Sequence, residues 1–284
     1  MILFPNCKIN IGLRIIRKRE DGFHDLETVF YPIYHLHDAL ELVQAHHSDS
    51  KNQFPVNFTF SGLKIDGDIS NNLSFKAYHL LKKDFPDLPN IQMHLHKVIP
   101  MGAGLGGGSA DGAFALKLLN EKFNLNLTAD QLMDYALQLG SDCPFLIINK
   151  PSFAWGRGNM MKNINLNLKG YSIILINPGI HINTAWAFEQ IIPSANRQTD
   201  TEKELQALIL QPIDSWKNAV ENDFESIVTN AHPIIGAIKS ELYKKGAVYA
   251  SMSGSGSTVY GIFPSHKMPM GKLFSSFFEA HVAL

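Results

Sequence analysis

A glycine-rich segment from Pro100 to Ala110, with the sequence PMGAGLGGGSA, carries the strongest chemical signal in this chain. Five of the seven residues from 102 to 108 are glycine. Glycine allows positive φ angles and lets the backbone approach a ligand closely, because no Cβ intervenes. The helix predicted directly after the segment would add N–H donors and a partial positive charge, which suit a phosphate. A simple turn needs only one or two glycines, so the segment predicts a phosphate-binding loop.

Two widespread phosphate motifs do not fit this segment. Gly102, Gly104 and Gly107 satisfy G-x-G-x-x-G, but a dinucleotide site also needs an acidic residue about 20 positions later, at the end of a second strand. The acidic residue in that zone, Asp130, instead lies at the start of a capped helix. The P-loop pattern G-x-x-x-x-G-K-[ST] occurs nowhere in the chain. The sequence therefore excludes both the Rossmann and the P-loop classes.

The N-terminal block offers further polar groups, each of which also has a structural interpretation. Lys8 lies on a predicted strand, where an outward lysine is usually only solvated. The Asp-Gly pair at residues 21–22 is typical of a hairpin turn. His24, beside it, could cap that turn or contact a ligand.

Two later segments are equally open to a structural explanation. Asp142, which follows Gly140 and precedes Cys143-Pro144, favours a helix stop and then an N-cap or Asx turn. The segment 251–258 could be a hairpin turn, but its run of small residues is longer than a turn requires. No His or Cys spacing typical of a metal site is present.

Hydrophobic periodicity predicts the elements that must position these groups. Helices are expected at 72–84, at 109–120 and over much of 184–244. A further helix is expected to begin at a capping box formed by Thr128 and Gln131 and to end at Gly140. A domain boundary is expected within 155–170, which is rich in glycine and asparagine. Strands are expected at 7–17, 28–33, 39–43, 56–60, 91–98, 145–148, 172–176, 247–252 and 258–263.

Composition limits the class of protein. The chain has 284 residues, 45% of them hydrophobic, which suits two sub-domains and excludes overall disorder. A net charge of −1 lacks the basic surface that duplex nucleic acid would require. No apolar run reaches the roughly 18 residues of a membrane span, and the N-terminus does not resemble a signal peptide. With two cysteines, Cys7 and Cys143, expected as reduced thiols, the composition predicts a cytoplasmic protein.

In this order the segments resemble the three signatures of the GHMP kinase superfamily: the block around Lys8, the loop 100–110 and the late loop 253–256. Within the superfamily they are most similar to the 4-diphosphocytidyl-2-C-methyl-D-erythritol kinase family. The motifs that carry this likeness are KIN-x-GL at 8–13, REDGFH-x-LETVFYPI at 19–33, GLGGGSADGA at 104–113 and LGSDCPF at 139–145.

The resemblance implies an α+β fold of the GHMP kinase type. Residues 1–160 would form an N-terminal ATP-binding and catalytic domain like domain 2 of ribosomal protein S5. Residues 161–284 would form a ferredoxin-like C-terminal domain. The implied reaction is ATP-dependent phosphorylation of the 2-hydroxyl of 4-diphosphocytidyl-2-C-methyl-D-erythritol, in the non-mevalonate route to isoprenoid precursors.

The resemblance also implies roles for particular residues. Lys8 and Asp142 would flank the acceptor hydroxyl, with Asp142 orienting it and taking its proton while Lys8 balances charge. Mg2+ would accompany ATP, with Ser109 as its candidate ligand. The expected ATP-binding residues are Pro100, Met101, Gly102, Ala103, Gly104, Leu105, Gly106, Gly107, Gly108, Ser109 and Ala110, with a second glycine loop at Ser253, Gly254, Ser255 and Gly256.

The cytidine side of the substrate is expected to contact Asn10, Phe23, His24, Thr184 and Phe188, with cytosine between aromatic faces and His24 at its edge. Three positions depart from the family's usual pattern: Cys7 replaces Ala, Phe23 replaces Tyr, and Asn159 replaces Glu.

Two alternatives stay open. A kinase of homoserine or a mevalonate derivative would share the superfamily signatures but lack the D-G-F/Y-H block at residues 21–24. A non-catalytic nucleotide-binding relative, or an RNA binder of similar topology, is opposed by the near-neutral charge and by the presence of both Lys8 and Asp142. The expected partners are the small-molecule substrate and ATP, without nucleic acid or membrane, for a monomer or homodimer.

Overall fold

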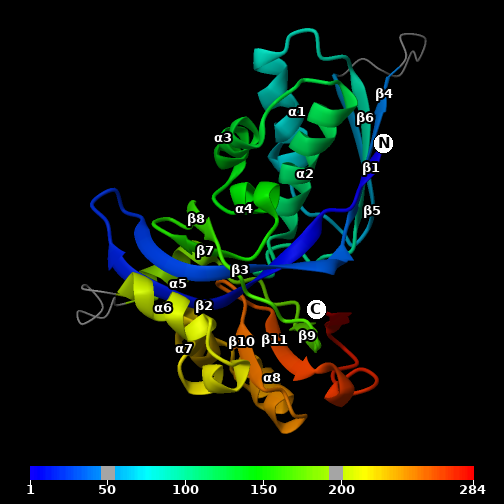
Figure 1. Ribbon diagram of the computed structural model, residues 1–284. Coiled ribbons are helices and arrows are strands. Elements are labelled where there is room, and N and C mark those ends of the chain that lie inside the picture. The colour runs from blue at the N-terminus through cyan, green and yellow to red at the C-terminus, as the bar shows by residue number, and fades with distance from the viewer. Residues whose placement is uncertain (46–54, 192–200) are drawn as a thin grey trace. The chain divides into compact units, whose positions relative to one another are not determined.

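The computed structural model describes residues 1–45, 55–191 and 201–284 and contains two compact units (Figure 1). The first unit comprises Met1–Cys7, Leu36–Met101 and Gly106–Asn149. The second unit comprises Lys8–His35, Gly102–Leu105 and Lys150–Leu284. Each unit contains several separate segments of the chain. The division into domains 1–160 and 161–284 therefore stays a prediction.

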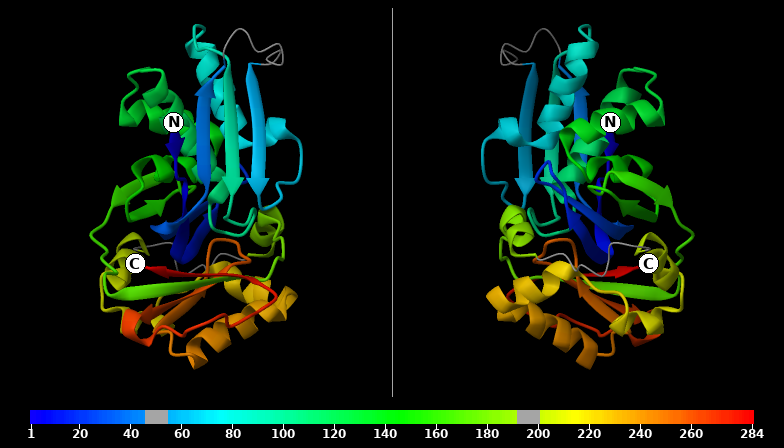
Figure 2. Two further views of the ribbon diagram at one scale, coloured as in Figure 1. Left: turned by 90° about the vertical axis from the view of Figure 1, so that its right-hand side faces the viewer. Right: turned by 90° about the vertical axis from the view of Figure 1, so that its left-hand side faces the viewer.

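The first unit contains a four-stranded sheet in the order β1-β4-β6-β5. Strands β5 and β6 are parallel, whereas the β1–β4 and β4–β6 pairs are antiparallel. In β6 the buried residues Ile91, Met93 and Leu95 alternate with more exposed ones, which is the pattern of a sheet covered on one face. Figures 1 and 2 show the helices of this unit gathered on that one side. The strands are β1 (Ile2–Leu3), β4 (Ala39–Gln44), β5 (Val56–Gly62) and β6 (Ile91–Lys97).

Local sequence signals place the helices of the first unit. The Asn72 side chain accepts a hydrogen bond from Ser74 N and caps α1, and Thr128 and Gln131 form the predicted capping box of α3. The strand predicted at 145–148 is wrong, because that apolar run belongs to a short helix with Pro144 in its first turn. The elements are η1 (Ile69–Asn71), α1 (Leu73–Asp84), α2 (Gly107–Lys122), α3 (Ala129–Leu139) and α4 (Cys143–Ile148).

The second unit contains an antiparallel sheet in the order β10-β11-β9-β12. This order, with helices between its first two strands in sequence, is ferredoxin-like. Helices α7 and α8 lie along one face (Figure 2), where Phe224, Val228, Ile238 and Leu242 join the core. The elements are β9 (Tyr171–Asn177), α5 (Thr184–Gln190), α6 (Thr201–Ile209), η3 (Ile213–Asn218), α7 (Asp223–Ala231), α8 (Pro233–Lys244), β10 (Tyr249–Met252), β11 (Val259–Pro264), η4 (Ser265–Lys267) and β12 (Phe278–Ala283).

A third sheet has the order β2-β3-β7-β8, with strands β2 (Asn6–Lys18), β3 (His24–His37), β7 (Ser152–Trp155) and β8 (Met160–Asn163). The Asp-Gly turn between β2 and β3 is confirmed: Gly22 has a φ of +82° and its N–H donates to the Arg19 carbonyl. Strands β1, β7, β8 and β12 were not predicted from the sequence. Among the described residues, no helix has the length and apolar character needed to cross a membrane.

Candidate functional site

The glycine-rich loop connects β6 to α2 in a conformation that requires glycine at several positions. Gly102, Gly104 and Gly106 have φ angles of +61°, +78° and +68°, in the left-handed region. A Cβ at Gly104 would also lie only 2.0 Å from the Ser253 carbonyl oxygen. The backbone of this loop therefore approaches the late loop more closely than any side chain would allow.

Helix α2 begins at Gly107, two residues earlier than predicted. Its N-cap residue, Gly106, has no side chain to occupy the N–H groups of the first turn. In the first unit the loop thus delivers backbone donors and the positive end of a 16-residue helix to one place. This arrangement is what an anion such as a phosphate needs.

A buried charged triad, composed of Lys97, Asp38 and Asp111, lies beneath that first helical turn. Lys97 Nζ is 2.5 Å from Asp38 Oδ2 and 2.7 Å from Asp111 Oδ2. The other Asp38 oxygen accepts hydrogen bonds from the backbone N–H groups of Val98 and Ile99. The side chains are at most 2% exposed. Sequence reasoning missed this triad, although an aspartate on the apolar face of α2 was an available signal.

The triad has shifted protonation equilibria. Burial raises the pKa of Asp111 to about 8, with the charge of Asp38 adding to the rise and Lys97 opposing it. Burial disfavours the charged Lys97, but the two carboxylates outweigh it and hold the pKa of Lys97 above its ordinary value. Burial therefore favours the neutral form of Asp111, which limits the cost of holding two carboxyl groups beside one buried ammonium group. Asp111 Oδ1 is nonetheless buried without a hydrogen-bond partner.

In the second unit, Lys8 and Asn10 lie on the same face of β2. Lys8 Nζ donates to Asn10 Oδ1 over 2.6 Å, and each residue is only 3% exposed. The interpretation of Lys8 as an outward, solvated lysine is therefore wrong. Asn10 N donates to Ser253 Oγ, which in turn donates to the Gly104 carbonyl over 2.8 Å. The structure thus brings the N-terminal block, residues 102–105 and the late loop together within the second unit.

The late loop at 253–256 is anchored more firmly than a plain hairpin turn. The Asn222 amide donates to the carbonyl oxygens of Met252 and Gly254, each over 2.8 Å. Thr184 and Ser255 are joined through their hydroxyls over 2.9 Å. Sequence reasoning missed Asn222, since it lies at the start of α7, far along the chain from the loop that it holds.

Aromatic residues meet at the β2–β3 turn of the second unit. The His24 and Phe188 rings are stacked, with centroids 4.9 Å apart and planes 19° apart. Phe23 is 49% exposed, and the Arg157 guanidinium covers one face of its ring at 3.5 Å from the centroid. Burial, together with the nearby charge of Lys18, lowers the pKa of His24, so its neutral form prevails at pH 7.

Asp142 belongs to the first unit and occupies the N-cap position of α4, as one structural interpretation expected. Its carboxylate does not cap the helix, so that interpretation does not explain the residue type. The next residue, Cys143, is buried, which raises the pKa of its thiol to about 12, although a Ser109 hydrogen bond opposes the rise. No disulfide joins Cys143 to Cys7, as predicted. Lys8 lies in the second unit and Asp142 in the first.

The described residues do not form a metal-binding site of their own. Within residues 1–45, 55–191 and 201–284, no three His, Cys, Asp or Glu side chains are arranged to hold a metal ion. The Ser109 hydroxyl is a suitable oxygen donor for Mg2+, but a single such ligand is not a cage.

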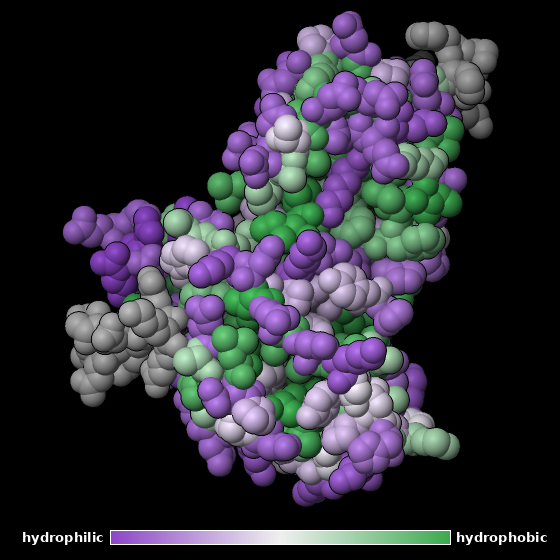
Figure 3. Space-filling view, viewed as in Figure 1, coloured by the Kyte–Doolittle hydropathy of each residue, from purple (hydrophilic) through white to green (hydrophobic). Residues whose placement is uncertain are grey.

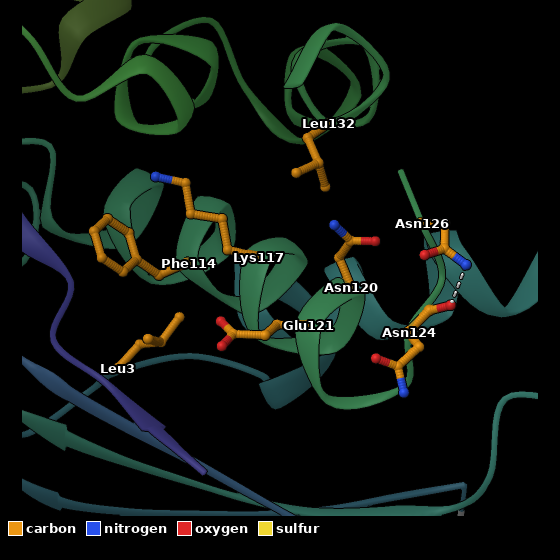
Figure 4. Close-up of a pocket in the computed structure, with 8 residues that line it drawn as sticks. All are labelled: Leu3, Phe114, Lys117, Asn120, Glu121, Asn124, Asn126 and Leu132. Carbon is orange, nitrogen blue, oxygen red and sulfur yellow. Dashed lines mark hydrogen bonds between the residues drawn. The ribbon is translucent and has the colours of Figure 1, made fainter. Parts of the chain in front are cut away.

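A cavity of about 530 Å3 in the first unit contains none of the predicted site residues. Figure 4 shows that it follows the C-terminal half of α2, with Phe114, Lys117 and Glu121 along the helix and Leu3 opposite. Lys117 donates to the Leu146 carbonyl over 2.8 Å, and burial lowers the pKa of Lys117 to about 8.

On the face shown in Figure 3, apolar side chains gather near the β1 edge of the sheet, where Ile2 and Phe4 are about half exposed.

Comparison with known proteins agrees with this architecture. The family model described as "GHMP kinases N terminal domain" matches residues 72–150, and "GHMP kinases C terminal" matches residues 204–268. The chain is similar to a protein of Bacteroides fragilis named 4-diphosphocytidyl-2-C-methyl-D-erythritol kinase, with 51% identity over 99% of this chain and 97% of the relative. A protein of the same name from Bacteroides thetaiotaomicron is 52% identical over 95% and 94% of the two chains.

A solved structure described as 4-(cytidine 5'-diphospho)-2C-methyl-D-erythritol kinase superimposes with a TM-score of 0.75. It is 26% identical and covers 93% of this chain and 91% of its own. This likeness confirms the predicted α+β fold of the GHMP kinases. The chain therefore belongs to the GHMP kinases and, within them, to the 4-diphosphocytidyl-2-C-methyl-D-erythritol kinase family.

Proposed function

We propose that the protein transfers the γ-phosphoryl group of ATP to the 2-hydroxyl of 4-diphosphocytidyl-2-C-methyl-D-erythritol. The observation that carries this proposal is the identity of about half of all residues, over nearly the whole chain, to proteins that bear the name of this kinase. The D-G-F-H block at residues 21–24 supports the cytidyl substrate over homoserine or mevalonate.

The proposed ATP site consists of residues 100–110 together with the second glycine loop at 253–256, which contacts Gly104 within the second unit. Support comes from the uncapped first turn of α2 and from the left-handed glycines that precede it. The N–H groups of that turn would contact the phosphates, since backbone donors at a helix start bind anions well.

The proposed catalytic pair is Lys8 and Asp142. Asp142 would orient the acceptor hydroxyl, whose oxygen attacks the γ-phosphorus while the bond from that phosphorus to the ADP oxygen breaks. The hydroxyl proton passes to the Asp142 carboxylate late in the step. Lys8 would balance negative charge that develops on the transferred group. The burial of the Lys8 ammonium group beside Asn10 supports this role, because burying a charge without a functional or structural role would cost folding free energy.

For the acceptor, we place cytosine against the exposed face of Phe23, with His24 at its edge and Phe188 nearby. The neutral form of His24 suits the hydrogen bonding of a neutral base. Asn10 and Thr184 would contact polar parts of the substrate.

Mg2+ would enter as part of the ATP substrate complex, with Ser109 as its one candidate protein ligand, because the described residues form no cage for it. Its chemistry would be to neutralise phosphate charge. The proposal also includes a cytoplasmic location and a monomeric or homodimeric state.

A coupled assay of ADP release tests the proposal with a panel of three acceptors: the cytidyl-diphospho substrate, homoserine and mevalonate. Turnover with the first alone is expected. Activity confined to homoserine or mevalonate would replace the substrate assignment, and ATP binding without turnover on any acceptor would favour a non-catalytic relative.

A further inference from the structure

The contact between Lys97 and the first turn of α2 is the starting point for a further inference. Gly107 lies directly above Lys97: a Cβ on this glycine would come within 3.1 Å of Lys97 Nζ and 2.9 Å of Ile99 Cγ2. Lys97 is at the end of β6, and Asp111 is one turn into α2. The ammonium group thus lies close to the first turn of α2, on the side toward which a Gly107 side chain would point.

We infer that Lys97, held between Asp38 and Asp111, is a positioning residue that sets the place of the α2 N-terminus for the phosphates of ATP. The inference rests on the proposed function, since it assigns that helix start to ATP. All five residues that carry the inference, Asp38, Lys97, Ile99, Gly107 and Asp111, lie in the first unit.

Two features separate this triad from an ordinary buried ion pair. It joins three segments at one point: Asp38 directly precedes β4, Lys97 ends β6, and Asp111 lies in α2. Asp38 also accepts hydrogen bonds from Val98 and Ile99, the residues that lead into the glycine loop, over 2.6 and 2.9 Å. Both ends of the loop are therefore tied to the same ammonium group.

Replacing a buried ion pair with hydrophobic residues of similar volume often stabilises a protein. A contribution to stability therefore does not by itself explain why these three charged residues are present. What such a cluster can add is a unique position for the elements that it joins, because each hydrogen bond is satisfied in only one arrangement. Phosphate binding by backbone N–H groups depends on that position, since hydrogen bonds weaken steeply when their angle or length is wrong.

The test measures the affinity of the full-length protein for a non-hydrolysable ATP analogue by calorimetry, together with the KM for each substrate. Lys97→Met is expected to weaken binding of the analogue about tenfold or more, whereas the KM for the acceptor changes less than about twofold. Asp111→Ala should behave similarly, and Asp111→Asn, which keeps an acceptor for Lys97, should restore most of the affinity.

Gly107→Ala provides a test that leaves every charge in place. The added methyl group would come within 3.1 Å of Lys97 Nζ and 2.9 Å of Ile99 Cγ2, and it is expected to weaken binding of the analogue by displacing the turn. This variant keeps the inference falsifiable if Lys97→Met does not fold. The matched control is Lys117→Met, which removes a partly buried lysine from the other end of α2 and should leave the affinity unchanged (Figure 4).

The inference is overturned if Gly107→Ala and every folded Lys97 or Asp111 variant bind the analogue within about twofold of the wild type. It is also overturned if Lys117→Met weakens binding equally, because the effect would then be general destabilisation of α2. The unaltered protein distinguishes failure of the inference from failure of the proposed function. If it does not bind the analogue, the proposed function itself is removed. If it binds the analogue but does not turn over the cytidyl-diphospho substrate, the acceptor assignment fails while the inference on ATP binding still stands.

Discussion

Lys8 Nζ donates a 2.6 Å hydrogen bond to Asn10 Oδ1, and the two side chains are almost completely buried side by side on β2. The Asn10 amide also donates to Thr28 Oγ1 over 2.9 Å, and its backbone N–H donates to Ser253 Oγ. Asn10 therefore connects the lysine of the N-terminal block to the late loop.

Asn10→Ala should lower both stability and activity. The substitution leaves a buried ammonium group without this acceptor and removes the hydrogen bond that the Asn10 amide donates to Thr28, so the free energy of unfolding should fall by about 2 kcal/mol. Urea unfolding measures this change. The control Asn57→Ala alters an exposed asparagine on β5 and should have little effect. Equal losses in the two variants would contradict the role given to the Lys8–Asn10 pair.

Asp142→Asn should separate binding from turnover. The amide keeps the shape of the side chain but cannot take the proton of the acceptor hydroxyl, so kcat is expected to fall about 100-fold or more. Affinity for ATP should stay within about twofold, as measured by calorimetry. Asp134→Asn, on the exposed part of α3, is the matched control. Turnover near the wild-type rate in Asp142→Asn would remove this residue as the base.

Gly104→Ala should be much more damaging than alanine at a glycine of similar φ in open space. The new Cβ would lie 2.0 Å from the Ser253 carbonyl oxygen, so the glycine loop or the late loop must move, at a cost of about 3 kcal/mol in stability and a loss of ATP affinity. Gly271 has a φ of +79°, against +78° at Gly104, and nothing lies within 4 Å of its would-be Cβ. Gly271→Ala should therefore cost only about 1 kcal/mol, the penalty of the left-handed conformation.

Thermal melts of the two glycine variants, alone and with ATP, make this comparison. A similar melting temperature for both would mean that the close approach of the two loops contributes little.

Phe188→Ala should weaken acceptor binding selectively. The substitution removes the stack on His24 and the edge-to-face contact with Phe224, whose centroid is 4.9 Å away. The KM for the cytidyl substrate is expected to rise about tenfold, while the KM for ATP stays constant. Steady-state kinetics with each substrate varied in turn will show the difference. Phe188→Leu retains packing but not the aromatic face, so recovery of the wild-type KM in that variant would argue against stacking.

Acceptor binding should depend on pH through His24. Burial lowers the pKa of His24 below its ordinary value of 6.5, so the unfolded chain binds this proton more readily than the folded one. The stabilisation that neutral His24 provides is complete above pH 6.5 and declines as the pH falls below that value. Protonation of His24 in the folded protein would change its hydrogen bonding to the base, so the KM for the cytidyl substrate should be constant between pH 7 and 8 and rise only as the pH falls below 6.5. His24→Gln should abolish the rise, and persistence of the rise in that variant would assign it to another group.

The sequence alone was sufficient wherever a local signal sets the structure. Glycines at 102, 104 and 106 predicted the loop because only glycine readily adopts their left-handed backbone, and the loop is where it was expected. Thr128 with Gln131 predicted the start of α3, and Asp21-Gly22 predicted the β2–β3 turn, because capping boxes and hairpin turns depend on residues a few positions apart.

Short apolar runs were less informative. Residues 143–148, CPFLII, are compatible with a buried strand or a buried helix, since periodicity cannot distinguish the two over so few residues. In the structure these residues are helical and pack against α2 and α3. The local signal for a helix was Pro144, because proline is favoured in the first turn of a helix.

Only the tertiary structure decided which polar residues are buried together. The place of Lys8 on a strand alone suggested a solvated side chain, although the family resemblance implied a catalytic role; the side chain is buried because the residues of β2 are covered on both faces. The Asn10–Ser253 bond joins residues 243 positions apart, and Asp38 meets Lys97 across 59 positions. These pairings could not be predicted from the sequence, because no pattern around a polar residue identifies the distant residue that it will contact. That choice depends on which strand and helix faces pack together, and it follows from burial of the surrounding apolar residues.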